Sequence, residues 1–167
     1  MVLIKSYRHK ILLHKLFKEG NRRVKKGMSA DLTKAIRILN EGGYTCVLCK
    51  ENRIYTSTER GVKFLLDWQN SGLDFSGFCA ADKVVGKAAA FLYVLLGVKE
   101  VYAYVMSEAA IDTLTKNNIQ IQYDKSVKKI VNRFGTGFCP MEEAVWDIDI
   151  PQQAKQAIEN KLLQMKK

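Results

Sequence analysis

The chain has 167 residues, of which 47% are hydrophobic and 26% charged, with only two prolines. This composition is typical of a folded domain and argues against a disordered chain. Its longest apolar stretch, residues 88–98, is well short of the roughly 20 residues that a membrane-spanning helix needs, so the sequence predicts no membrane span.

The formal net charge of +10 is concentrated at one end. Residues 1–27 contain nine lysines or arginines and one acid, which gives a net charge of +8 and leaves the remaining residues nearly neutral. We therefore divide the chain into a basic N-terminal arm, 1–27, and a domain over 28–167. The arm is expected to be a solvated extension, with nucleic acid or a membrane surface as the alternative partner of its cations.

The four cysteines are Cys46, Cys49, Cys79 and Cys139, and no secretory signal precedes them. This pattern favours a reducing, cytoplasmic location and free thiols over a disulfide framework. Cys46 and Cys49 have the Cys-x-x-Cys spacing of metal sites, but residues three apart in a strand point to opposite faces. We therefore expect buried thiols, and we expect no metal and no cofactor.

Helical and extended patterns alternate along the domain after a first helix and a hairpin. In chain order we predict a helix over 31–40 capped by Ser29, strands over 44–50 and 53–58, a helix over 61–72, a strand over 74–80, a helix from Asp82 to near Gly97, a strand over 100–107, a helix over 109–118, a strand over 119–123, a loop over 125–138, a short helix over 139–148 and a C-terminal helix over 150–167. Strands joined through helices pair in parallel. We therefore predict an α/β fold, a three-layer α/β/α sandwich around a mixed five-stranded sheet with an N-terminal hairpin.

This order of elements resembles the cytidine-deaminase-like fold. More specifically, residues 29–150 are similar to a small family of uncharacterised bacterial domains assigned to that superfamily. The similarity rests on AADKVVGKAAA (80–90), GVKEVYAYVMSEAAIDTL (97–114) and GTGFCPMEEAV (135–145). The resemblance implies the fold and no known reaction.

The zinc-binding motif of the deaminases is missing from the positions that would have to carry it. Zinc deaminases have His or Cys, then any residue, then Glu at the start of the helix after the hairpin, and Pro-Cys-x-x-Cys at the start of the next helix. Here these two helices are predicted to begin with ERGVKFLL and ADKVVGKA. Hydrolytic deamination on zinc is therefore disfavoured.

The start of the helix predicted at Asp82 is the first candidate site, because ligands of α/β sheets bind where strand ends meet helix N-termini. Lys83 and Lys87 are four residues apart in that helix and repel each other, which an anion would relieve. We predict a small anionic, nucleotide-like ligand bound by these lysines, Asp82 and Gly86. The structural alternatives are an N-cap role for Asp82 and close helix packing at Gly86.

The second candidate is the glycine-rich stretch before the short helix at 139–148. Gly135 and Gly137 would let the backbone approach a ligand, and a helix terminus would stabilise a Cys139 thiolate. Cys139 is thus a candidate nucleophile, with Asp82 or Glu142 assisting proton transfer, and a plain helix cap is the alternative. The sequence leaves three functions: a metal-free module for an anionic ligand, an enzyme using Cys139, and a nucleic-acid-associated module acting through residues 1–27.

Overall fold

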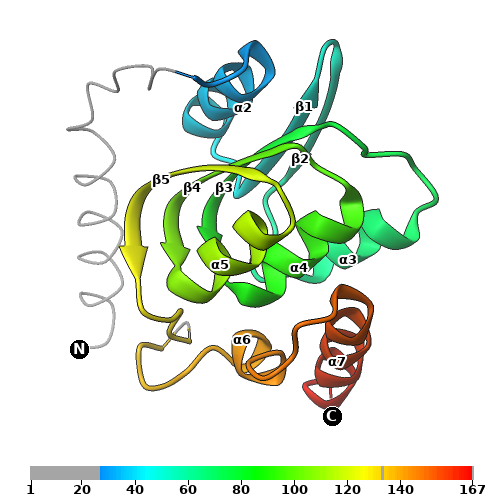
Figure 1. The fold of residues 1–167 in the computed structure, drawn as a ribbon, viewed down its shortest axis with the longest axis vertical. Coiled ribbons are helices and arrows are strands. Elements are labelled where there is room, and N and C mark those ends of the chain that lie inside the picture. Colours follow the sequence, from blue (N-terminus) through cyan, green and yellow to red (C-terminus); the bar gives the residue numbers. More distant parts are fainter. Residues whose placement is uncertain (1–26, 133, 167) are drawn as a thin grey trace, which may run out of the picture.

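A computed structural model describes residues 27–132 and 134–166, which form one sheet with helices on both faces (Figure 1). The basic arm lies outside the described residues apart from Gly27. In chain order the elements are α2 (Ala30–Glu41), β1 (Cys46–Lys50), β2 (Arg53–Ser57), α3 (Lys63–Asn70), β3 (Cys79–Val85), α4 (Lys87–Leu96), β4 (Glu100–Ser107), α5 (Glu108–Lys116), β5 (Gln120–Val127), α6 (Pro140–Ala144) and α7 (Pro151–Gln164).

The five strands are ordered β2-β1-β3-β4-β5 across the sheet. Strand β1 is antiparallel to both β2 and β3, whereas β3, β4 and β5 run parallel to one another. The predicted mixed five-stranded sheet with an N-terminal hairpin is therefore confirmed. We call the side of the sheet at which β3, β4 and β5 end the carboxyl edge.

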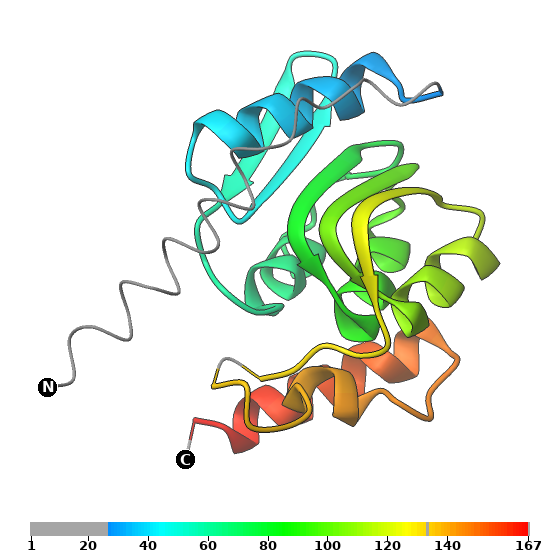
Figure 2. The same ribbon diagram turned by 90° about the vertical axis from the view of Figure 1, so that its left-hand side faces the viewer.

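The two faces of the sheet are covered unequally (Figure 2). Helix α2 packs on one face, where its buried residues Leu32, Ala35 and Leu39 meet the sheet. The other face carries α3, α4 and α5, and α7 packs against the outer side of α4. Because α4 has neighbours on most sides, nearly all its residues are buried and its pattern is apolar rather than amphipathic.

Several expected boundaries are wrong. Strand β5 runs on to Val127, into the loop predicted at 125–138, and the strand predicted at 74–80 and the helix predicted from Asp82 are displaced along the chain. Strand β3 begins only at Cys79, and α4 begins at Lys87 after the extended residue Gly86. Pairing explains the shift, because Asp82 lies between Cys46 of β1 and Ala103 of β4 in the sheet. The pairing of β3 with a strand on each side thus outweighs the local preference of the residues from Asp82 on to start a helix.

The apolar pattern before β3 has a different origin. Phe75 and Phe78 are buried in the loop, where their ring centroids lie 5.5 Å apart and each packs edge-on against Tyr55. The loop therefore has the apolar sequence pattern of a strand, because its aromatic side chains fill the core beside the hairpin. Strand β4, in contrast, spans the predicted residues 100–107.

Among the described helices, none is long and apolar enough to cross a membrane. The thiols of Cys46, Cys49 and Cys79 are free and buried, and the Cys139 thiol is free and half-buried. The predicted cap of the first helix is confirmed: the Ser29 side chain accepts a hydrogen bond from the Leu32 amide at 3.2 Å.

We expect Ser29→Ala to lower the free energy of unfolding by about 1 kcal/mol, because the first turn of α2 loses its cap. Ser126→Ala, at an exposed position of β5, is the matched control and should change it by less than about 0.5 kcal/mol. Urea denaturation followed by circular dichroism measures both. Equal stability of the two variants would show that Ser29 does not hold this turn.

Candidate functional site

The carboxylate of Glu142 lies at the carboxyl edge and is only 1% exposed. Its Oε1 accepts hydrogen bonds from the Lys87 amide at 3.1 Å and from the Ser107 hydroxyl, and its Oε2 accepts one from the Ile130 amide at 2.5 Å. Lys87 is the first residue of α4 and Ser107 is the N-cap of α5. An internal carboxylate therefore occupies the helix terminus where the sequence predicts an external anion.

The two lysines of the predicted anion site do not share a helix face, so that part of the prediction is wrong. Lys83 is a half-buried residue of β3 whose amide donates to the Thr45 carbonyl. Lys87 is buried, and its Nζ donates to the carbonyl oxygen of Trp146 at 2.5 Å and lies 5.7 Å from the ring centroid of Phe91. The Lys87 ammonium thus contacts other residues of the same chain.

Gly86 is where the segment after β5 comes closest to the start of α4. A Cβ atom here would lie 3.0 Å from Cγ1 of Ile130 and 3.3 Å from Oε1 of Glu142. The backbone of Gly86 is extended, with φ of −95°, so this glycine is required for space and not for its conformation. The expected close approach at Gly86 is therefore to another part of the same chain.

Asp82 lies in β3 at the face covered by α4, and it is not the N-cap of that helix. Its Oδ2 accepts a hydrogen bond from the Tyr93 hydroxyl at 2.5 Å, and its Oδ1 accepts one from the Val84 amide at 3.1 Å. The same hydroxyl lies 3.2 Å from the Cys46 sulfur. These three side chains, from β3, α4 and β1, form a polar cluster inside the apolar core.

Burial raises the pKa of Asp82 from 3.8 to about 6, although hydrogen bonds from Tyr93 and Val84 oppose the shift. Burial and the nearby Asp82 charge also raise the pKa of Tyr93 and of Cys46 well above their ordinary values. Tyr93 and Cys46 are therefore neutral near pH 7. Asp82 is the member of the cluster whose pKa lies closest to physiological pH.

A buried serine extends the cluster toward the hairpin. Ser57 pairs with Cys46 across the sheet, and Cys46 pairs with Asp82, so the three side chains point to the same face in one row. The Ser57 hydroxyl accepts a hydrogen bond from the Glu59 amide at 3.0 Å. Sequence analysis missed Ser57 and Tyr93, because only strand register and helix packing place them beside Asp82.

The glycine-rich stretch forms a small ribbon that leads into α6. Gly135 is in the left-handed region with φ of +68°, and Gly137 accepts a hydrogen bond from the Asn132 amide at 2.8 Å. Cys139 is the N-cap of α6, as predicted, but its side chain makes no cap hydrogen bond. Within the described chain, no hydrogen bond joins Cys139 to Asp82 or Glu142, the acids expected to assist it. A role for Cys139 as nucleophile gains no support from this geometry.

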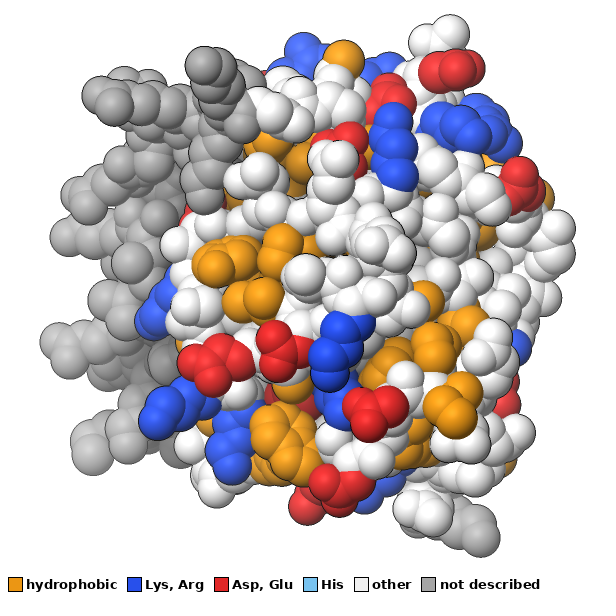
Figure 3. Space-filling model, in the orientation of Figure 1, with side chains coloured by type: hydrophobic (Ala, Val, Ile, Leu, Met, Phe, Trp, Pro, Cys, Tyr) orange, Lys and Arg blue, Asp and Glu red, His pale blue; other side chains and the backbone are white. Residues whose placement is uncertain are grey.

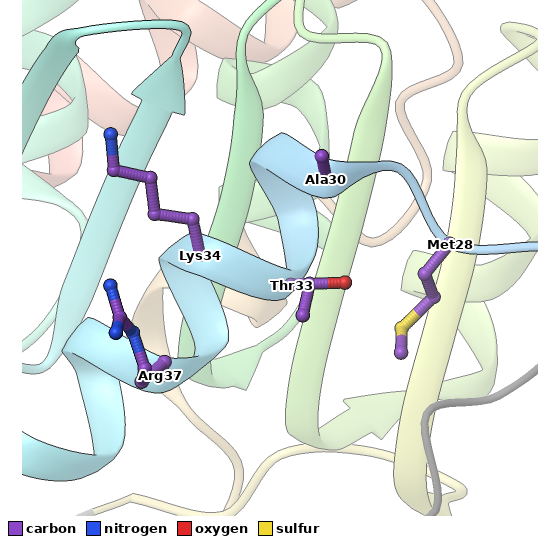
Figure 4. Close-up of a pocket in the computed structure, with 5 residues that line it drawn as sticks. All are labelled: Met28, Ala30, Thr33, Lys34 and Arg37. Atoms are coloured by element: carbon purple, nitrogen blue, oxygen red, sulfur yellow. The ribbon is translucent and has the colours of Figure 1, made fainter.

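A hollow of about 650 Å³ lies beside the start of α2, on the opposite face of the sheet from Asp82. It is lined by Met28, Ala30, Thr33, Lys34 and Arg37 (Figure 4). Lys34 donates to the Glu51 carbonyl at 2.9 Å. The lining contains two cations and no acid, so the hollow offers no acid–base chemistry.

The residues at the two relevant helix starts do not fit a zinc ion. Helix α3 begins at Val62 and Lys63, and α4 begins at Gly86 and Lys87, none of which supplies a zinc ligand. Among residues 27–132 and 134–166, no group of three His, Cys, Asp or Glu side chains is placed to hold a metal ion.

These observations define a mixed α/β domain with two buried acids, Glu142 at the carboxyl edge of its sheet and Asp82 in the middle of β3. The chain belongs to the DUF1893 family: the family model described as "Domain of unknown function (DUF1893)" matches residues 34–162. The match covers most of the described domain and excludes the basic arm.

A solved structure shows the same fold. The crystal structure of a DUF1893 family protein (TM1506) from Thermotoga maritima, at 2.70 Å resolution, matches with a TM-score of 0.74. The match covers 80% of this chain and 92% of that chain, with 23% sequence identity. At this identity the likeness shows the fold alone. No curated protein matches the chain.

We expect Glu142→Gln to lower the free energy of unfolding by about 3 kcal/mol, because an amide NH₂ then faces donors that now bind a carboxylate. Glu143→Gln, at the exposed neighbouring position, should change it by less than about 0.5 kcal/mol. Chemical denaturation of both variants checks this. A loss of similar size in both would contradict the role given to Glu142.

Gly86→Ala tests the same contact from the other side. The added methyl group must displace Ile130 or Glu142, so we expect a loss of about 1–3 kcal/mol in unfolding free energy. In the Glu142→Gln background the loss should shrink, because the contact is already weakened. Strictly additive losses in the double variant would argue against coupling between the two positions.

Proposed function

We propose that the protein is a cytidine-deaminase-like module that works without zinc and binds a small nucleoside-like ligand near Asp82. The assignment to this fold is supported by the hairpin that precedes alternating helices and strands, and by the strand order β2-β1-β3-β4-β5. Since neither α3 nor α4 begins with a metal ligand, the chemistry of the site has to come from other groups.

The observation that carries this proposal is the buried acid Asp82, whose hydrogen-bond donors are neutral. The residue is 6% exposed and forms no ion pair with any residue in the described chain. Burying an acid in this way costs stability, and such costs are concentrated at functional sites. Asp82 is the central residue of β3, between the antiparallel strand β1 and the parallel strand β4.

The hydrogen-bonding capacity of Asp82 favours a ligand that donates. A carboxylate has about four acceptor sites, of which the Tyr93 hydroxyl and the Val84 amide use two. When protonated, the carboxyl group can instead donate to a ring nitrogen while it accepts from the adjacent amino group. Cytosine and adenine present this pair of groups, and the hydroxyl of Ser57 in the same row suits a sugar hydroxyl.

The anionic ligand expected from the sequence is a second candidate, favoured by the donors that converge on Glu142. The Lys87 amide, the Ser107 hydroxyl and the Ile130 amide would bind a phosphate or carboxylate equally well. Such a ligand would first have to displace Glu142. It should therefore bind Glu142→Gln more tightly than the unaltered protein.

Thermal unfolding in the presence of cytidine, adenosine and their 5′-monophosphates tests both candidates. At pH 6 we expect a nucleoside to raise the Tm of the unaltered protein and of Asp112→Asn, an exposed-acid control, but not of Asp82→Asn. A shift seen only with the monophosphates, and larger in Glu142→Gln, would instead support the anion site. No shift with any compound, or an equal shift in Asp82→Asn, would refute the role of Asp82.

The raised pKa of Asp82 also predicts a pH dependence of stability. Because the folded protein holds this proton more tightly than the unfolded chain, folding is favoured while Asp82 is protonated, and that contribution is lost as pH rises from about 4 to about 6. The shift corresponds to about 3 kcal/mol. The unfolding free energy of the unaltered protein minus that of Asp82→Asn should fall by this order across the range, and a flat difference would contradict the burial of the charge.

A further inference from the structure

The segment between β5 and α6, described at residues 128–132 and 134–138, forms a ribbon before α6. Val131 and Phe138 pair in an antiparallel bridge, which places the turn between them. The Asn132 side chain closes this turn, because its Oδ1 accepts hydrogen bonds from the amides of Phe134 and Thr136 at 3.0 and 3.1 Å. The turn therefore has a defined shape.

The ribbon displays apolar side chains to solvent. Phe134 is 79% exposed, and Val131 is 60% exposed. Phe138 contacts Trp146 edge-on with ring centroids 5.0 Å apart, and the indole is itself 40% exposed. The turn is thus closed by two hydrogen bonds to Asn132 and leaves the Phe134 ring in water, where a planar ligand can reach it.

The same ribbon is positively charged. Lys128 and Lys129 are exposed, and the described residues between 128 and 138 include no acid. The Lys129 ammonium lies 4.8 Å from the ring centroid of Phe138, so a cation and the aromatic surface are adjacent. In Figure 3, Lys and Arg side chains lie beside hydrophobic ones on the lower left of the face shown, with Asp and Glu side chains next to them.

We propose that this ribbon binds single-stranded nucleic acid, with Phe134 stacking on a base and Lys128 and Lys129 contacting phosphates. Proteins that bind single strands with little sequence preference usually combine aromatic side chains that stack on bases with cations that contact the nucleic-acid backbone. Charge complementarity favours this partner over an uncharged protein surface. A membrane is less well matched, because polar Asn132 and Thr136 flank the phenyl ring, and stable membrane binding requires a larger apolar area. The proposal is independent of the ligand assigned to Asp82.

Fluorescence anisotropy with a labelled 20-nucleotide oligouridine and the full-length chain tests the ribbon. We expect Phe134→Ala to weaken binding about tenfold or more, the loss of one stacked base. Leu73→Ala, which removes an exposed apolar side chain from the loop before β3, should leave affinity unchanged. Thermal unfolding of each variant checks that the fold is retained.

The salt dependence of oligouridine affinity distinguishes binding by the ribbon from binding by the basic arm of residues 1–27. The double variant Lys128→Ala/Lys129→Ala should reduce the slope of log affinity against log salt by about 1.4, whereas Phe134→Ala should lower affinity with the slope unchanged. Two results would overturn the proposal: unaltered oligouridine affinity in Phe134→Ala, or failure of the unaltered protein to bind. Binding to phosphatidylserine vesicles that is lost in Phe134→Ala, with oligouridine affinity retained, would overturn it in favour of a membrane.

Discussion

The buried carboxylate of Glu142 is the interaction on which the carboxyl edge depends. It joins the first amide of α4, the cap of α5 and the chain after β5, parts of the molecule that are distant in sequence. A buried charge is tolerated only where several donors surround it, so each of these segments has to keep its place. The need for glycine at position 86 is a consequence of the same constraint, because the carboxylate oxygen approaches within 3.3 Å of where a Cβ would lie.

The contrast between Glu142 and Asp82 separates structure from function. Glu142 receives hydrogen bonds from three donors and is almost completely enclosed. Asp82 receives two, from Tyr93 and Val84, keeps a small exposed area, and has a pKa raised to about 6 because burial is not fully offset. Glu142 is thus surrounded by donors from three segments, whereas Asp82, in the middle of β3, has fewer donors and a raised pKa. We propose that Asp82 is the acid available to a ligand.

Much of the fold was predictable from local patterns. The hairpin, strand β4 over 100–107 and the Ser29 cap follow from β-branched residues, apolar runs and capping chemistry, which are short-range signals. The start of α4 could not be predicted from local patterns. Asp82 and Lys83 have the sequence of a first helical turn, and only the pairing of β3 with β1 and β4 keeps them extended. Nor does any local signal link Glu142 to Lys87, 55 residues away, or bring Tyr93 to Asp82. The candidate site is therefore a tertiary feature, although Asp82 and Glu142 were recognisable as candidates.

The central claim is that Asp82 is a buried, titrating acid that recognises a nucleoside. Carbon-13 NMR of the Asp82 carboxyl group, titrated with pH with and without cytidine or adenosine, measures this directly. The account predicts a midpoint near pH 6 in the free protein, and a displaced midpoint with altered Val84 and Ser57 amide signals when nucleoside is added. A midpoint near that of an ordinary aspartate, or a titration that neither nucleoside changes, would contradict it.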